Sequence, residues 1–310
     1  PAPAALAPRP RFEWVRGRRA ARLAIAPGTS LYGTGEVAGR LRRNGTRVTL
    51  WNTDAYDYDD RSPALYQSHP WVLAVRADGS AYGVLFDTTH RATLDLSRDI
   101  LAVADGPAFG VIVIERDSPQ EVVCALADLT GHMPLPPRWA IGYHQSRYSY
   151  TPASRVLEVA ATLRARGIPC DAMWLDIDHM DGHRSFTWHP EDFPQPKRLL
   201  ESLRSQGFHS VAIVDPGIRA ARGHPVYESG ERRNAWIRMP HGRPFIGKVW
   251  PGACVFPDFT RRDVREWWSE RTAEFVRDGL DGIWTDMNEP AVFETPTRTM
   301  PVAARHLADA

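Results

Sequence analysis

Cysteine, long apolar segments and net charge are all scarce in this sequence, and each shortage excludes a class of protein. The three cysteines (Cys124, Cys170 and Cys254) are too few and too far apart for a disulfide framework, so a reducing compartment is expected. No apolar run reaches the roughly 18 residues that a membrane-spanning helix needs. A formal net charge of +1 provides no overall attraction to nucleic acid or to an anionic membrane.

Sequence signals for a bound cofactor or metal are also missing. Gly33 and Gly35 precede a polar stretch instead of a crossover helix, so they do not predict a phosphate-binding loop. His179 and His183 lie on a loop after a predicted strand, without the glutamate that accompanies such a pair in zinc proteases. We therefore expect no cofactor and no metal.

The composition is that of a soluble globular protein with more than one domain. The chain has 310 residues, of which 43% are hydrophobic and 24% charged, and this length favours two domains. A cytoplasmic location is expected, and because the sequence begins with Pro1, removal of an N-terminal signal is the alternative. Tryptophan is abundant, at 11 residues, and its ring suits both protein cores and sugar rings.

The N-terminal part of the chain has the pattern of short antiparallel strands. Alternating or apolar runs occur at residues 46–51, 71–76, 81–87, 92–96 and 110–115. Turn residues such as Asp78-Gly79 separate these runs. The arginines near the N-terminus are interrupted by Phe12 and Trp14, so we expect them on the solvated side of early strands. The pattern predicts a β-sandwich domain over residues 1–132.

A helix and a proline-rich segment mark the end of this domain. Residues 118–130 begin with Ser118 as a helix cap, Pro119 at the first helical position and Glu121 three residues after the cap. Residues 133–137 (MPLPP) follow, and so many prolines favour an extended interdomain linker. The second domain is therefore expected to cover residues 133–310.

Strand and helix patterns alternate in the second domain. Strands are expected at residues 138–146, 172–177, 210–214 and 282–287. Helices are expected from Thr151 to the glycine at 167, at 199–204 and at 263–276, with an insertion around 219–250. This order predicts parallel strands, here about the first half of a (β/α)8 TIM barrel.

Three of the predicted strands end in an aspartate, at Asp176, Asp215 and Asp286. The carboxyl ends of barrel strands line the mouth of the active site in this fold. One such aspartate could be a helix cap, but three at successive strand ends indicate a shared functional rim. The sequence therefore predicts a carboxylate-rich site at this edge.

The segment around Asp286 carries a resemblance to a known family. Residues 284–290 (WTDMNEP) resemble the nucleophile signature of glycoside hydrolase family 31, the α-glucosidase family. Motifs at 138–150, 174–180, 213–218 and 249–259 resemble the family's preceding strands in order and spacing. Motifs at 31–36, 50–54 and 65–70 resemble its sandwich, so the resemblance spans about residues 25 to 305.

The resemblance implies a galactose-mutarotase-like sandwich followed by a TIM-barrel catalytic domain, and it assigns roles to single residues. Asp286 matches the nucleophile, and Asp176 matches a carboxylate that binds hydroxyls of the sugar in subsite −1. The walls of that subsite match Tyr148, Ile177, Ile213, Trp250, Trp284 and Met287. Asp54, on a sandwich loop, resembles a residue on the leaving-group side, and His179 stands where the family commonly has tyrosine.

The implied function is that of a retaining α-glucosidase acting on oligosaccharides or α-glucosides. Such enzymes use one carboxylate as nucleophile and a second carboxyl group, about 5–5.5 Å away, as acid and then base. In the family the acid/base is an aspartate well downstream of the nucleophile, so we expect it beyond Ala310 and do not assign it to Asp176. The 310-residue chain alone is then expected to be inactive toward an aryl α-glucoside.

Other interpretations of the same residues stay open. An α-xylosidase or an α-glucosyl transglycosylase would use the same scaffold, and a non-catalytic carbohydrate-binding homologue is a second alternative. Asp178 and Asp215 could act on substrate or could tie loops together, and for Asp215 we expect the structural role. Neither nucleic acid nor a membrane is expected as a partner, and the sequence does not indicate the oligomeric state.

Overall fold

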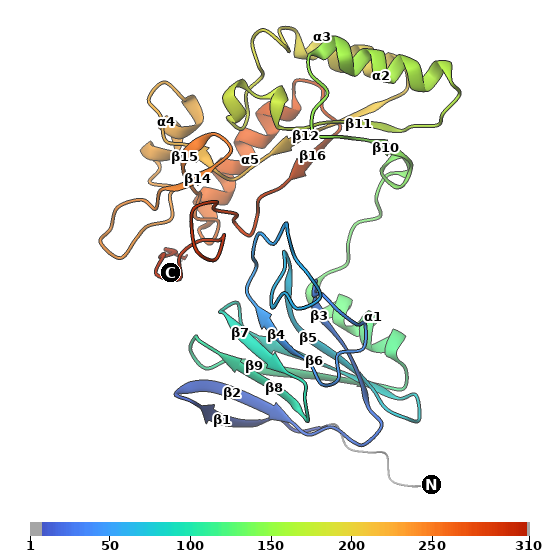
Figure 1. Cartoon of the computed structure of the whole chain (residues 1–310), viewed down its shortest axis with the longest axis vertical. Helices are drawn as coiled ribbons and strands as arrows, with labels where there is room; N and C mark the ends of the chain where they lie inside the picture. The colour runs from blue at the N-terminus through green and yellow to red at the C-terminus, as the bar shows by residue number, and fades with distance from the viewer. Residues whose placement is uncertain (1–7, 309–310) are drawn as a thin grey trace. The chain divides into compact units, whose positions relative to one another are not determined.

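The computed structural model describes residues 8–308. The chain divides into two compact units, Pro1–Pro134 and Leu135–Ala310, which are described separately below (Figure 1). Within residues 8–308, the first unit contains strands and one α-helix, whereas the second alternates strands with helices.

Unit 1 consists of two antiparallel sheets. One sheet has the strand order β1-β2-β8-β7-β4 and the other the order β3-β5-β6-β9. The first sheet comprises β1 (Arg11–Val15), β2 (Arg18–Leu23), β8 (Ile100–Ala104), β7 (Ala92–Asp95) and β4 (Arg47–Leu50). The second comprises β3 (Ser30–Gly35), β5 (Ser68–Val75), β6 (Ala81–Asp87) and β9 (Gly110–Arg116). All five strands expected from the sequence are present, and the early strands are β1 and β2.

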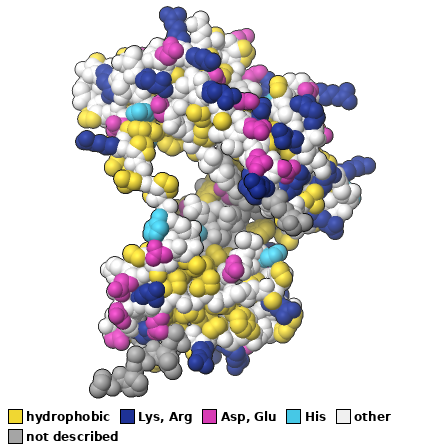
Figure 2. Space-filling model, turned by 180° about the vertical axis from the view of Figure 1, so that it is seen from behind, with side chains coloured by type: hydrophobic (Ala, Val, Ile, Leu, Met, Phe, Trp, Pro, Cys, Tyr) yellow, Lys and Arg dark blue, Asp and Glu magenta, His cyan; other side chains and the backbone are white. Residues whose placement is uncertain are grey.

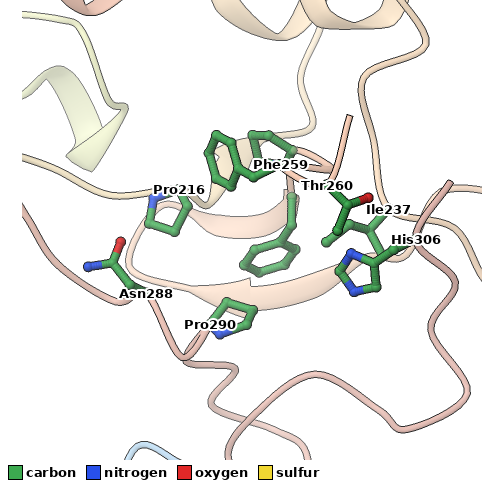
Figure 3. Close-up of a pocket in the computed structure, with 9 residues that line it drawn as sticks. Pro216, Ile237, Phe259, Thr260, Asn288, Pro290 and His306 are labelled. Atoms are coloured by element: carbon green, nitrogen blue, oxygen red, sulfur yellow. The ribbon is translucent and has the colours of Figure 1, made fainter. Parts of the chain in front are cut away.

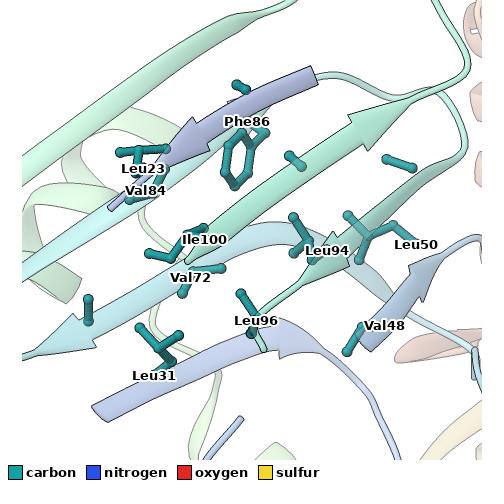
Figure 4. Close-up of a cluster of buried hydrophobic side chains, with 14 of the residues drawn as sticks. Leu23, Leu31, Val48, Leu50, Val72, Val84, Phe86, Leu94, Leu96 and Ile100 are labelled. Atoms are coloured by element: carbon teal, nitrogen blue, oxygen red, sulfur yellow. The ribbon is translucent and has the colours of Figure 1, made fainter. Parts of the chain in front are cut away.

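Side chains from both sheets of unit 1 meet in one apolar core (Figure 4). Leu31 and Val72 come from the second sheet, and Leu94 and Ile100 from the first, and all four are fully buried. Because successive residues of a strand point to opposite faces, alternate apolar positions can supply such a core. Burial of each of these side chains contributes about 1.5–3 kcal/mol. The sandwich predicted from the sequence is confirmed.

Helix α1 (Pro119–Thr130) closes the sandwich unit. The Oγ of Ser118 accepts a hydrogen bond from the backbone N–H of Glu121 at 3.3 Å, which confirms the predicted cap. Within the helix, Val122 is fully buried and packs against Ala81 of β6 and Ile114 of β9. The cap therefore fixes where the helix begins, and a single apolar contact region holds it to the sheet.

Unit 2 is built on a parallel sheet with the strand order β10-β11-β12-β16. Its strands are β10 (His144–Gln145), β11 (Ala172–Leu175), β12 (His209–Val214) and β16 (Gly282–Thr285). Three helices alternate with them: α2 (Ala153–Ala165), α3 (Pro196–Ser205) and α5 (Arg262–Val276). Short 3₁₀ helices occur at Arg138–Ile141, Ile177–His179 and Asp181–His183.

The strand predicted at residues 138–146 is mostly wrong. Residues 138–141 form a 3₁₀ helix, and only His144 and Gln145 pair with β11. The indole of Trp139 stacks on the ring of His209, with centroids 4.4 Å apart, so this apolar residue contacts the start of β12 from outside a strand. Apolar character at this position reflects side-chain packing instead of strand pairing.

Helices α2, α3 and α5 share one core with the parallel sheet. Val156 and Ala160 of α2 and Leu200 and Leu203 of α3 are buried in it, together with Phe275 of α5. The same cluster contains Met173, Leu175, Ala212 and Val214 from the strands. These helices therefore cover a single face of the sheet.

The segment between β12 and α5 forms a separate excursion. A small antiparallel sheet has the order β13-β15-β14, with β13 (Ile218–Arg219), β14 (Gly247–Val249) and β15 (Gly252–Val255). Helix α4 (Pro225–Arg232) lies within it. Trp236, which is 1% exposed, packs with Ile218 and with Trp267 of α5, so the excursion is held to unit 2 by its own apolar cluster.

Charged side chains of both signs are interspersed over the face seen in Figure 2, without a broad area of one sign. This distribution agrees with the near-zero net charge of the sequence, +1. Within residues 8–308, no helix has the length and apolar character that crossing a bilayer requires.

Candidate active site at the strand ends of unit 2

Three neighbouring parallel strands of unit 2 end directly before an aspartate. Asp176 follows β11, Asp215 follows β12 and Asp286 follows β16. Since β11 pairs with β12 and β12 with β16, all in parallel, the three strand ends lie along one edge of the sheet. The structure thus brings together the three aspartates that the sequence singled out.

The alternation of side chains along the strands orients these aspartates toward the same face. Leu175 and Val214 belong to the core under the helices, whereas Ile213 and Trp284 belong to a cluster on the other face. Asp215 is two residues from Ile213 and Asp286 two residues from Trp284, so their side chains are expected on that helix-free face. This face corresponds to the interior of a barrel.

Asp176 is half-buried at the end of β11. Its Oδ1 accepts a hydrogen bond from the backbone N–H of Ile177 at 2.7 Å, which fixes the carboxylate at the start of the next turn. Burial raises the pKa of Asp176 above its ordinary value, and the charges of Asp178 and Asp286 act in the same direction. The bond from Ile177 opposes this shift.

Asp215 is much more deeply buried, with 3% of its surface exposed. Burial raises the pKa of Asp215 to about 7. The negative charges of Asp286, Asp176 and Glu289 add to this effect, because a second anion nearby disfavours ionisation. The three carboxyl groups can influence one another because parallel pairing brings their strand ends to one edge of the sheet.

An apolar wall lies beside the carboxyl groups. Ile177 and Ile213, each 2% exposed, pack with Met180, and the indole of Trp284 packs against this cluster. The ring centroid of Trp284 lies 5.4 Å from that of Trp174 on β11. Three of the six residues assigned to subsite walls, Ile177, Ile213 and Trp284, are therefore neighbours.

Tyr148 and Trp250 meet from distant parts of the sequence. Their ring centroids are 6.4 Å apart, and both side chains are exposed. Burial raises the pKa of Tyr148, and the negative charges of Asp178 and Asp176 act in the same direction. Carboxylates can accept hydrogen bonds from the hydroxyl groups of a sugar, and exposed aromatic rings can pack against the apolar face of its ring.

Sequence reasoning missed two partners of Trp250. The ring of Phe293 lies 5.0 Å from it in an edge-on arrangement, and the ring of His183 lies 6.4 Å away. The Nε2 of His183 is 2.9 Å from Oδ1 of Asp178. The sequence suggests His183 only as a metal ligand, and its position five residues after Asp178 is the one local signal for this pairing.

Two other predicted site residues, Met287 and Asp54, are not members of this wall cluster. Met287 has a positive φ of 57° and packs with Val249 and Phe256 in a different apolar cluster. Asp54 lies in unit 1, in the loop between β4 and β5. The roles assigned to Met287 and Asp54 therefore stay predictions.

A cavity of about 390 Å³ lies next to the strand ends (Figure 3). Pro216, which follows Asp215, and Asn288 and Pro290, which follow Asp286, contribute to its lining. The remaining lining is mostly apolar and includes Phe256 and Phe259. None of the three strand-end aspartates lines this cavity, so it adjoins the carboxylate site without containing it.

The donor groups of the described residues do not assemble a metal centre. Among residues 8–308, no group of three or more His, Cys, Asp or Glu side chains is arranged to hold an ion. His183 pairs with Asp178, and His179 is buried among aromatic rings.

The fold and the site define a β-sandwich domain followed by part of a TIM-barrel domain with carboxylates at its strand ends. Two family models match the chain. The TIM-barrel domain of glycosyl hydrolases family 31 matches residues 133–309, and the N-terminal galactose mutarotase-like domain of glycosyl hydrolase 31 matches residues 10–95. The chain belongs to glycoside hydrolase family 31.

Similar proteins are named as α-glucosidases. Alpha-glucosidase 2 of Bacillus thermoamyloliquefaciens is 42% identical over 89% of this chain, and the alpha-glucosidase of Saccharolobus solfataricus is 37% identical over 85%. The solved family 31 alpha-glucosidase of Bacteroides thetaiotaomicron superposes with a TM-score of 0.85 at 45% identity over 93% of this chain. The matches cover 35%, 38% and 50% of those three proteins, respectively, so the chain spans half of their length or less.

Proposed function

We propose that this chain carries the nucleophile half of a retaining α-glucosidase site, with Asp286 as the nucleophile. The observation that carries the proposal is the convergence of Asp176, Asp215 and Asp286 at adjacent strand ends of a family 31 barrel domain. The names of the similar proteins support α-glucosidase activity over the xylosidase and transglycosylase alternatives.

In this proposal the carboxylate of Asp286 attacks the anomeric carbon of a terminal α-linked glucose. The glycosidic C–O bond breaks, the leaving oxygen takes a proton from the acid/base group, and a glycosyl ester forms on Asp286. Water then cleaves the ester with the acid/base group acting as base. The acid/base is assigned to a residue outside this sequence, as the family resemblance implies.

The remaining site residues would bind the sugar. Asp176 would accept hydrogen bonds from sugar hydroxyls, and its negative charge would stabilise the oxocarbenium-like transition state. Tyr148 and Trp250 offer exposed rings to the apolar face of the sugar. Ile177 and Ile213 are almost fully buried, so they would shape the floor of the subsite through Trp284.

A glucosyl fluoride that forms a slowly hydrolysed ester tests this proposal. Fluoride leaves with little protonation, so trapping of the nucleophile does not depend on the acid/base group. We expect peptide mapping of the treated 310-residue chain to find the label on Asp286. The folded variant Asp286→Asn should stay unlabelled, and Asp178→Asn is the matched control that should still be labelled.

The outcomes separate the enzyme from a sugar-binding protein. A folded chain that binds glucose, detected by a change in tryptophan fluorescence, but is not labelled would contradict the enzyme function and support a carbohydrate-binding homologue. A label on a residue other than Asp286 would contradict the assignment of the nucleophile.

A further inference from the structure

In the described part of the chain, one oxygen of the buried carboxyl group of Asp215 lacks the hydrogen bond that a loop-tying role would require. Its Oδ1 has no hydrogen-bond partner within residues 8–308. The loop is tied by the backbone instead: Ser185 Oγ donates to the carbonyl of Asp215 at 2.8 Å, and the N–H of Asp215 donates to the same Oγ at 3.2 Å. The backbone is thus fixed, and one carboxyl oxygen is left for another function.

The position of Asp215 places it next to Asp286. Val214 is opposite Thr285 in the last pair of β12 with β16, so Asp215 and Asp286 occupy the next positions beyond the paired residues. Both side chains are expected on the helix-free face, because successive side chains of a strand point to opposite faces of the sheet. Neighbouring strands lie about 4.7–4.9 Å apart, a separation that two carboxyl groups can span.

The ionisable groups around Asp215 all favour its neutral form. Asp176 approaches from the end of β11, and Asp286 and Glu289 approach from the segment after β16. On the side of β15, burial raises the pKa of the Cys254 thiol to about 12, so this neighbour is neutral as well. A buried acid among anions holds its proton to a higher pH than usual, and with a pKa of about 7 Asp215 is protonated below neutral pH.

We propose that Asp215 is a positioning residue whose protonated form donates a hydrogen bond to the carboxylate of Asp286. A protonated carboxyl group has an O–H donor, and an ionised neighbour is its strongest acceptor. The bond would hold one oxygen of Asp286 and leave the other directed at the anomeric carbon. This inference rests on the proposed function, since it assigns Asp215 through the role of Asp286.

Carbon-13 NMR of the 310-residue chain, labelled at the aspartate carboxyl carbons, tests the proposal. The resonances of Asp215 and Asp286 are identified by their loss in Asp215→Asn and Asp286→Asn. We expect Asp215 to titrate near pH 7, and the Asp286 resonance to move over the same range. That movement should vanish in Asp215→Asn and persist in the control Asp178→Asn.

Titration of Asp215 near its ordinary pKa of about 4 would overturn the proposal. The proposal would also be overturned if the Asp286 resonance did not move while Asp215 titrates. A carboxyl group with a merely structural role would leave that resonance unchanged. If Asp215→Asn does not fold, infrared spectra of the wild-type chain and Asp286→Asn supply the comparison. The carbonyl band of a protonated carboxyl should disappear around pH 7 in the wild type and should shift when Asp286 is replaced.

The two proposals can fail separately. Coupled titration without trapping of Asp286 by the glucosyl fluoride would reject the proposed enzyme function and retain the hydrogen bond. Trapping without coupled titration would reject the positioning role of Asp215 and retain the nucleophile.

Discussion

His179 connects the turn after β11 to the aromatic cluster behind it. Its Nδ1 lies 2.9 Å from the backbone carbonyl of Asp176, and its ring lies 4.9 Å from Trp188 and 6.0 Å from Phe275. Complete burial lowers the pKa of His179 to about 4, so the imidazole is neutral at pH 7. A carbonyl can only accept, so Nδ1 carries the proton and holds the turn that presents Asp176.

The variant His179→Phe tests this function of the imidazole. It keeps an aromatic ring but loses the hydrogen bond, so we expect a loss of about 1 kcal/mol in the free energy of unfolding at pH 7. The lowered pKa makes the wild type lose stability as the pH falls from about 6.5 towards 4, because the unfolded chain binds the proton more readily. Urea unfolding at pH 7 and pH 4.5 should show a smaller acid loss for the variant. Parallel losses would contradict this account.

Asp215 gives the opposite dependence on pH. Its pKa is raised from 3.8 to about 7, so its stabilising contribution is complete below about pH 4 and is lost as the pH rises through 7. A shift of this size corresponds to on the order of 4 kcal/mol. We expect Asp215→Asn to be the more stable protein at pH 8.5, and to lose its advantage at pH 5. Urea unfolding at both pH values measures the difference, and equal differences would refute the buried-acid assignment.

At the scale of elements, the start of helix α1 can be tested directly. Ser118 caps the helix by accepting from the N–H of Glu121. Ser118→Ala should reduce the free energy of unfolding of unit 1 by about 1 kcal/mol, and Ser118→Asp should retain most of the stability because aspartate is also a good cap. Thermal unfolding followed by circular dichroism compares the variants. Equal losses in both would show that the cap does not hold α1.

Local sequence patterns predicted most elements because their signals are local. The cap and proline of α1, and the apolar face of α2 through Val156, Ala160 and Leu163, lie where the pattern places them. The error at 138–146 arose because Trp139 packs on His209, a contact between residues far apart in sequence. The expected strand at 172–177 ends at Leu175, since the side chain of Asp176 caps a 3₁₀ turn instead of continuing the pairing.

The candidate site was predictable to the extent that it depends on strand ends. Asp176, Asp215 and Asp286 follow apolar runs, and parallel pairing then brings them together. The pairing of Tyr148 with Trp250 depends on the path of the excursion after β12, which no local pattern reveals. The hydrogen bonds of Asp215 could not be predicted from local sequence. In the folded structure its backbone carbonyl accepts from Ser185, whereas its Oδ1 has no partner among the described residues.

At the scale of the whole molecule, each unit has its own apolar core. The sandwich core contains fully buried residues such as Leu94 and Phe86, and the core between sheet and helices of unit 2 contains Leu203 and Phe208. A domain with its own core can unfold as a cooperative unit, and proline-rich segments such as 133–137 are typical of boundaries between domains. We therefore expect that a cavity-forming substitution in one core destabilises only the unit that contains that core.

Matched cavity variants examine this prediction. Leu94→Ala and Leu203→Ala each remove a side chain with 0% exposure, and each should cost about 2–5 kcal/mol in its own unit. Hydrogen exchange followed by mass spectrometry should show faster exchange in residues 8–134 for Leu94→Ala and in residues 135–308 for Leu203→Ala. If either variant accelerates exchange equally in both ranges, the two units unfold together. The proline-rich segment would then not separate two independently unfolding units.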